Sequence, residues 1–284
     1  MRVDSRLAQG LTRSFEFFPP KSDDESVVLD QTLRDLEPLR ASFVSVTNRG
    51  GTASRQRTFD LVTHVQRERQ TSAMAHLICV GYTRDAMRGL LARYAEAGVE
   101  NVMALGGDPS DDPTLGASEF RYALELVELA REAGDFSIGV AAHPLGHPRS
   151  TDLVSDRRHL ATKLRAADFA ITQFFFEAQD YFSLIEQLGE LGVTKPVIPG
   201  IMPVTTLSGI SRMSLMGAAV PATLAERLHA AHRRGGSREV RSEGVRAASE
   251  LCAELLTAGV PGLHFYTLNR STATREIHSS LFGQ

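Results

Sequence analysis

The chain has 284 residues, of which 42% are hydrophobic and 23% are charged, and its formal net charge is −3. These fractions are close to the roughly 45–50% and 25% of soluble globular proteins, so they exclude a disordered chain. Because acidic and basic residues are interspersed, neither nucleic acid nor an anionic membrane is expected as a partner. The composition favours a small-molecule ligand.

The two cysteines, Cys79 and Cys252, are too few for a disulfide framework and lack the spacing of a structural zinc site. This cysteine usage predicts a protein of the reducing cytosol. The residues before Ser14 have no apolar core typical of a secretion signal, and no apolar run approaches the ~20 residues needed to cross a bilayer. We therefore expect a soluble, cytoplasmic protein.

Eight short apolar, β-rich runs recur along the chain and predict strands. Several are continuously apolar, which is typical of parallel strands buried on both faces. Helical periodicity lies between them, for example over 83–99 and 120–135. The predicted strands fall within 14–18, 43–47, 74–80, 101–107, 137–143, 169–176, 197–203 and 263–269.

This eightfold alternation of strands and helices indicates an α/β fold, a single (β/α)8 TIM barrel, and we expect residues 1–284 to form one such catalytic domain. A doubly wound open sheet is the alternative. It would carry a glycine-rich phosphate loop after the first strand, whereas this strand runs into Pro19 and Pro20. Segments 108–118 and 233–241 are expected to be a loop and a charged linker.

Polar residues at the carboxyl ends of barrel strands line the active site in this architecture. We therefore predict that the residues at these ends converge on one pocket. They are Glu16, Thr47, His76, Asp108, His143, Gln173, Tyr266, Asn269 and Arg270.

Glu16 is surrounded in sequence by phenylalanines, and desolvation is expected to raise its pKa so that it donates a proton near neutrality. An ion pair inside the barrel is the alternative. Asp108 follows Gly106 and Gly107, where missing side chains let a ligand approach the backbone; the alternative is a helix-capping or turn aspartate. Gln173 lies among aromatic residues, where its amide needs partners on both faces, either a flat heterocycle or the backbone.

His143 and His147 are four residues apart, but Pro144 and Pro148 argue against the helix that would bring both rings to one metal. We therefore expect no metal site. A metal-dependent barrel hydrolase that uses these histidines with Asp108 remains a competing interpretation, although no HxH motif follows the first strand to support it.

The runs SFEFFPPK (14–21), AITQFFFE (170–177) and HFYTLNR (264–270) occur in this order with FVSVT, AHLIC, ALGGD, AAHPLGHP and IPGIMPV between them. Together they resemble the methylenetetrahydrofolate reductase family over essentially the whole catalytic barrel, in its shorter bacterial form. The resemblance implies reduction of 5,10-methylenetetrahydrofolate to 5-methyltetrahydrofolate with NADH or NADPH as the electron donor. The sequence does not choose between the two donors and does not indicate an oligomeric state.

The resemblance also assigns roles. Glu16 would be the general acid that protonates folate N10, and Asp108 would stabilise charge on the pterin. Substrate binding would involve Asp108, Gln173, Tyr266 and Arg270. The positions that the family uses for its cofactor are Thr47, His76, Tyr122, Ala123, His143, His147, Asp156 and Lys163.

Family members usually hold FAD, but the flavin side departs from the family pattern at Gly106, Asn48, His143 and Thr162. Losing two hydrogen bonds to charged groups, at roughly 1.5–3 kcal/mol each, would weaken FAD binding by about two to four orders of magnitude. We therefore expect FAD to be bound weakly or not at all, with hydride passing directly from NAD(P)H to the folate. A folate-binding protein without catalysis is a further alternative.

Overall fold

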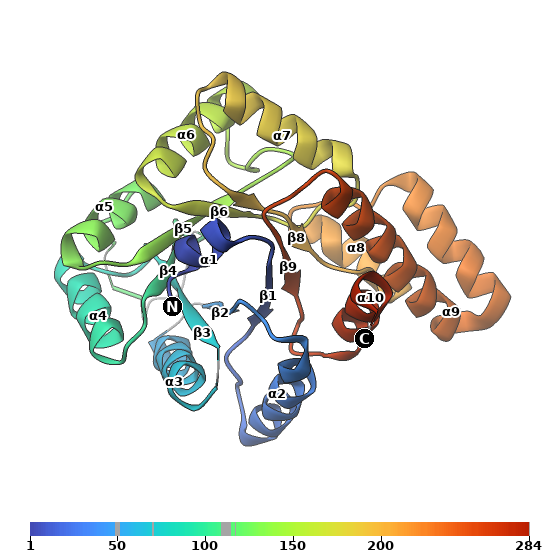
Figure 1. The fold of residues 1–284 in the computed structure, drawn as a ribbon, viewed down its shortest axis with the longest axis horizontal. Coiled ribbons are helices and arrows are strands. Elements are labelled where there is room, and N and C mark those ends of the chain that lie inside the picture. The colour runs from blue at the N-terminus through green and yellow to red at the C-terminus, as the bar shows by residue number, and fades with distance from the viewer. Residues whose placement is uncertain (49–51, 70, 109–114, 117, 284) are drawn as a thin grey trace.

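The computed structural model describes residues 1–48, 52–69, 71–108, 115–116 and 118–283. Parallel strands form a nearly closed barrel with helices around it, which confirms the predicted TIM-like fold (Figure 1). The strands are β1 (Thr12–Phe17), β2 (Phe43–Val46), β3 (Ser72–Ile78), β4 (Asn101–Leu105), β5 (Ser137–Ala142), β6 (Phe169–Thr172), β7 (Val197–Ile198), β8 (Gly200–Ile201) and β9 (Gly262–Tyr266).

The strands pair in the order β7-β6-β5-β4-β3-β2-β1-β9-β8. β7 and β8 are the two halves of one predicted strand, separated by Pro199, which has no N–H to donate to a ladder. β7 pairs with β6 and β8 pairs with β9, so this run joins the two ends of the sheet. The eight predicted runs therefore correspond to the eight strand positions of the barrel, with β7 and β8 sharing one position.

Helices connect successive strands and cover the outside of the barrel (Figure 1). Side chains cap the first turns of some of these helices, as where Thr83 accepts a hydrogen bond from Ala86 N and Asp152 accepts one from Ser155 N. The helices are α1 (Val3–Gln9), α2 (Asp23–Leu36), η1 (Glu37–Leu39), α3 (Thr52–Glu68), α4 (Arg84–Glu96), α5 (Ala123–Ala133), α6 (Leu153–Ala166), α7 (Ala178–Glu190), α8 (Leu207–Leu215), α9 (Ala222–Thr257) and α10 (Thr272–Phe282).

Helix α1 was not predicted, and it closes the amino-terminal end of the barrel. Val3 is fully buried against Phe43, Met74 and Met103 in the apolar floor of the interior. Val3 N also donates to the side chain of Asn101, the first residue of β4, at 2.7 Å. The interior is therefore packed at this end, and ligands reach it from the carboxyl ends of the strands.

The prediction of a charged linker over 233–241 is wrong. This segment belongs to α9, and only Gly235 and Gly236 leave helical geometry within it. The two arms of α9 fold back on each other, since Arg227 bonds both Glu243 and Glu250. Among the described residues, no helix has both the length and the apolar character needed to cross a membrane.

Candidate active site

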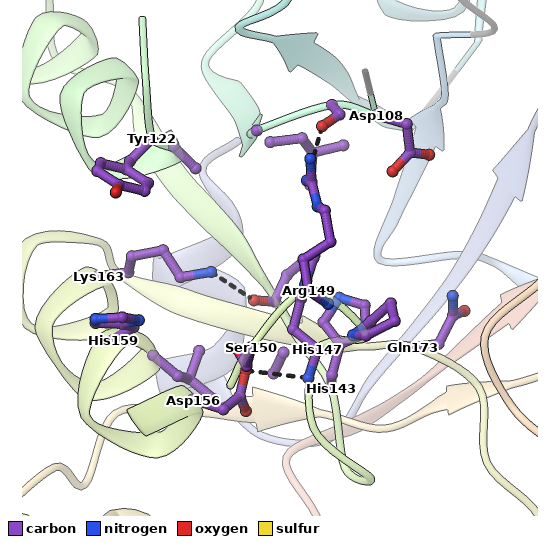
Figure 2. A pocket seen from close by; sticks show the side chains of 18 of the residues that line it. Asp108, Tyr122, His143, His147, Arg149, Ser150, Asp156, His159, Lys163 and Gln173 are labelled. Carbon is purple, nitrogen blue, oxygen red and sulfur yellow. Dashed lines mark hydrogen bonds between the residues drawn. The ribbon is translucent and has the colours of Figure 1, made fainter. Parts of the chain in front are cut away.

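A cavity of about 1160 Å³ opens at the carboxyl ends of β3 to β6 (Figure 2). Gly107, with φ of +77°, turns the chain out of β4 just before Asp108. The loop between β5 and α6 forms the opposite wall. Predicted site residues on the cavity wall are Asp108, Tyr122, Ala123, His143, His147, Asp156, Lys163 and Gln173.

His143 and His147 do come together on this wall, with ring centroids 4.7 Å apart in an edge-to-face arrangement. Burial lowers the pKa of His143 to about 4, and burial also lowers the pKa of His147. Both rings are therefore neutral at pH 7. Across the described part of the chain, no three His, Cys, Asp or Glu residues are grouped so as to hold a metal ion.

The loop that carries these histidines is held by a buried ion pair at the start of α6. The Asp156 carboxylate accepts hydrogen bonds from Ser150 Oγ and His147 N, both at 3.1 Å. Arg157, 4% exposed, donates to Asp156 at 2.8 Å and to the His143 carbonyl at 2.9 Å. This pair therefore fixes the shape of the cavity wall.

Two further predicted residues, Lys163 and Gln173, form hydrogen bonds with the protein backbone. Lys163 Nζ donates to the Ala141 carbonyl at 3.2 Å, and burial lowers the pKa of this lysine. Gln173 donates to the Met216 carbonyl at 2.9 Å and accepts from Phe174 N at 3.1 Å. The glutamine amide is therefore satisfied by backbone groups, as one of the two sequence interpretations expected.

Arg149, which the sequence interpretation passed over, also lines the cavity. Its guanidinium reaches across from the β5–α6 loop and donates to the Gly107 carbonyl at 3.0 Å (Figure 2). It therefore links the two walls. A basic residue two positions after His147 was the only available signal.

This cavity is not lined by the remaining predicted residues, which are Glu16, Thr47, His76, Tyr266, Asn269 and Arg270. Glu16 and His76 point into the barrel and are 7% and 6% exposed. The Tyr266 hydroxyl donates to the Thr172 carbonyl at 2.7 Å, from β9 to the end of β6. Thr47 is half-buried after β2, and Arg270 is exposed after β9.

Several polar side chains surround Glu16 inside the barrel. We call Ser14, Glu16, Ser45, His76 and His264 the interior cluster. Glu16 Oε2 lies 3.5 Å from Nε2 of His76, from Nε2 of His264 and from Ser45 Oγ. The sequence interpretation missed His264 and the two serines. The signal was strand periodicity, because Ser14 shares the inner face with Glu16, and His264 shares it with Tyr266.

The expectation of a raised Glu16 pKa is wrong for this arrangement. Burial does raise the pKa, but His76, His264 and the Ser45 hydroxyl outweigh it, so that the pKa of Glu16 lies below its ordinary value. Burial also lowers the pKa of His76, which the carboxylate only partly offsets. Glu16 is therefore ionised when no ligand is present.

Comparisons with known proteins identify the family of this chain. A sequence profile described as Methylenetetrahydrofolate reductase matches residues 2–282. The chain belongs to the methylenetetrahydrofolate reductase family. A relative from Escherichia coli named 5,10-methylenetetrahydrofolate reductase is 33% identical over 94% of this chain and 90% of its own length. Methylenetetrahydrofolate reductase 1 of Schizosaccharomyces pombe is 32% identical over 98% of this chain and 48% of its own length.

The family match confirms the resemblance found in the sequence and the prediction of an oxidoreductase of this type, and it disfavours the barrel hydrolase. A solved structure supports the fold alone. It is an uncharacterized protein from Clostridium thermocellum, described as binding two copies of 5-methyl-5,6,7,8-tetrahydrofolic acid. Its TM-score is 0.70 at 12% identity, over 98% of this chain and 96% of the other.

Proposed function

We propose that this protein reduces 5,10-methylenetetrahydrofolate to 5-methyltetrahydrofolate, with NADH or NADPH as hydride donor and residues 1–284 acting as one catalytic barrel domain. The observation that carries the proposal is the Glu16 carboxylate, held inside the barrel of a chain that matches the family over 2–282. The folate bound by the Clostridium thermocellum protein is consistent with a folate in a barrel of this shape. We place the reaction in the cytosol.

The proposed chemistry begins at N10 of the folate. Glu16, acting as general acid, protonates N10 while the bond between N10 and the methylene carbon breaks, which leaves an iminium at N5. Hydride from the nicotinamide then reduces the iminium carbon to a methyl group. Asp108 stabilises the positive charge on the pterin during this step.

The remaining contacts to the substrate are proposed from the same assignments. Gln173 lines the cavity and would turn its amide from the Met216 carbonyl to the pterin. Tyr266 would contact the folate beside Glu16. Arg270, exposed after β9, would bind the anionic tail of the substrate.

The cavity wall is a poor fit for a tightly held FAD. Of the described α6 residues on this wall, Lys163 alone carries a cationic group, and it is bonded to the Ala141 carbonyl. The Thr162 hydroxyl donates to Arg158 O within its own helix. A Cβ added at Gly106 would meet nothing within 4 Å, so a side chain could begin there, but the glycine supplies no cation. Two arginines on the wall are also engaged, Arg149 with the Gly107 carbonyl at 3.0 Å and Arg121 with the Tyr122 ring at 5.2 Å. A diphosphate that must stay bound through turnover would therefore have to displace existing contacts.

We therefore propose that hydride passes directly from NAD(P)H to the folate in a ternary complex. A dissociable donor tolerates weak phosphate contacts, because it binds only for each turnover, whereas a resident flavin does not. The iminium carbon is electrophilic enough to accept hydride from a nicotinamide. The positions Thr47, His76, Tyr122, Ala123, His143, His147, Asp156 and Lys163 would then serve the donor.

A steady-state assay tests the proposal: oxidation of NADH and of NADPH with methylenetetrahydrofolate, with and without added FAD. We expect turnover without FAD, initial-rate plots that intersect as for a ternary complex, and a preference that identifies the donor. Yellow protein that releases stoichiometric FAD would overturn direct transfer. Tight folate binding without oxidation of either donor would instead show a non-catalytic folate-binding protein.

A further inference from the structure

His264 is the most firmly held side chain next to Glu16. It is fully buried on β9, and its Nδ1 lies 2.8 Å from Ser14 Oγ. The Phe43 ring stacks on it with centroids 6.1 Å apart, and the Tyr266 ring meets it edge-on at 5.2 Å. The imidazole therefore has one orientation, with Nε2 directed at the Glu16 carboxylate.

The contacts of Ser14 allow a proton on Nδ1 of this ring. Ser14 Oγ donates to the Leu263 carbonyl at 3.4 Å, and in the tautomer with a proton on Nδ1 its oxygen accepts from Nδ1–H of His264. Nε2 then faces Glu16 Oε2 at 3.5 Å and, among the described residues, has no hydrogen-bond partner. A buried nitrogen without a hydrogen-bond partner destabilises the fold, and a proton placed between Nε2 and Oε2 removes this free-energy penalty.

His76 does not offer the same arrangement. Its Nε2 is also 3.5 Å from the Glu16 carboxylate, but neither of its ring nitrogens has a hydrogen-bond partner within the described chain. No anchor therefore sets its tautomer or fixes the ring. Of the two imidazoles beside Glu16, His264 alone is oriented by a second hydrogen bond.

We propose that His264 is a positioning residue for Glu16: its Nε2 and Glu16 Oε2 share the proton that Glu16 donates, while Ser14 fixes the ring through Nδ1. The inference rests on the proposed reductase function. During turnover that proton moves from Oε2 to folate N10 as the bond from N10 to the methylene carbon breaks. NAD(P)H gives its hydride to the iminium carbon and leaves as NAD(P)⁺, and the pair then takes a proton from solvent.

Sharing a proton changes how activity depends on pH. The titratable groups that face Glu16 and His264 are His76 from β3 and Tyr266 from β9, and Ser14 and Ser45 contribute hydroxyls. His264 lowers the pKa of Glu16 itself, but the proton that leaves the carboxylate is kept by the pair, so the pair loses it at higher pH than Glu16 would alone. Without His264, Glu16 alone must hold the proton, so the alkaline limb of kcat should move to lower pH.

Two substitutions separate the roles of the ring nitrogens. His264→Asn keeps an amide near Nδ1 that can bond Ser14 but leaves nothing facing Glu16. His264→Gln reaches the position of Nε2 and can donate to the carboxylate, but it cannot hold a proton. His278→Asn is the matched control, because His278 is equally buried on α10 and contacts Arg13 outside the site.

We expect kcat to fall about tenfold to a hundredfold in both His264 variants, more in the Asn variant, with the alkaline limb at lower pH. KM for both substrates should change by less than about threefold, since binding contacts are kept. His278→Asn should keep the wild-type kcat and limb. A wild-type kcat and limb in either His264 variant, or a lower kcat with higher KM and an unmoved limb, would overturn the proposal.

A measurement without turnover covers the case in which the variants fail to fold. In ¹⁵N-histidine-labelled protein at neutral pH, the Nε2 chemical shift of His264 should differ between wild type and Glu16→Gln, because Nε2 faces the carboxylate only in the wild type. Identical shifts would refute the shared proton. This result is independent of the reductase assignment, which fails separately if the wild type oxidises neither NADH nor NADPH with methylenetetrahydrofolate.

Discussion

Replacing Glu16 by glutamine removes the proposed acid while keeping the shape of the barrel interior. The amide has the same size as the carboxylate and retains an oxygen and an N–H that can face His264, His76 and Ser45, each 3.5 Å from the native Oε2. No cavity is created, and the wall residues of the ligand cavity are untouched. The variant therefore isolates proton donation from packing.

The magnitude follows from the role. A positioned general acid contributes about 10²–10⁴ in rate, which corresponds to roughly 3–5.5 kcal/mol of transition-state stabilisation. Glu16→Gln should therefore lower kcat by this factor, with KM for methylenetetrahydrofolate within about threefold of the wild type. The fall in kcat reports loss of a group that acts only in the transition state.

The pH dependence of the unfolding free energy gives a second measurement, and its direction can be predicted. Because the folded-state pKa of Glu16 lies below its ordinary value, the carboxylate stabilises the fold above that ordinary pKa, and this contribution is lost as pH falls through the folded pKa. Glu16→Gln should thus be less stable than wild type at pH 7. The difference in unfolding free energy should shrink as the solution is acidified.

Initial rates of NAD(P)H oxidation and chemical denaturation between neutral and acid pH measure both effects. Glu243→Gln is the control, because Glu243 is a 5% exposed glutamate of α9 paired with arginines away from the cavity. It should lose stability but keep kcat. Unchanged turnover in Glu16→Gln would remove this carboxylate from the mechanism, and a stability difference that persists in acid would refute the ionised resting state.

Three further predictions concern the cavity wall. Gly106→Arg combined with Thr162→Arg should raise FAD affinity by about two to four orders of magnitude, measured by flavin fluorescence titration, and unchanged affinity would refute the phosphate argument. Arg157→Met leaves the buried Asp156 carboxylate unpaired and should cost about 3 kcal/mol, or roughly 6–12 °C in Tm, by calorimetry; an unchanged Tm would contradict the role of this pair. Since burial lowers the pKa of His143 to about 4 from the usual ~6.5, the wild type should lose stability between those values as pH falls, and His143→Phe should lose less in the same denaturation series.

The barrel itself was predictable from the sequence because each strand position is a short apolar run with its own turn residues. What could not be predicted depends on partners distant in sequence. Helix α1 was missed because its one deeply buried residue, Val3, finds its apolar contacts on strands further along the chain. The break at Pro199 was invisible because pairing to both β6 and β9 emerges only when the sheet closes.

The candidate site shows the same division. The strand-end rule placed Asp108, His143 and Gln173 in one cavity, since parallel strands end at the same rim. Desolvation of Glu16 was also expected from its phenylalanine neighbours. The sign of its pKa shift was not, because the imidazoles that reverse it come from β3 and β9, far along the chain.

The position of α1 at the amino-terminal end of the barrel determines where another molecule can be attached without blocking the ligand cavity. The terminal ammonium of Met1 pairs with Glu100, just before β4 begins, so the chain starts at the mouth opposite to the one that admits ligands. A surface tether or fused partner joined there through a flexible spacer would face away from incoming ligands. Immobilised through this end, the protein should keep its access route unobstructed.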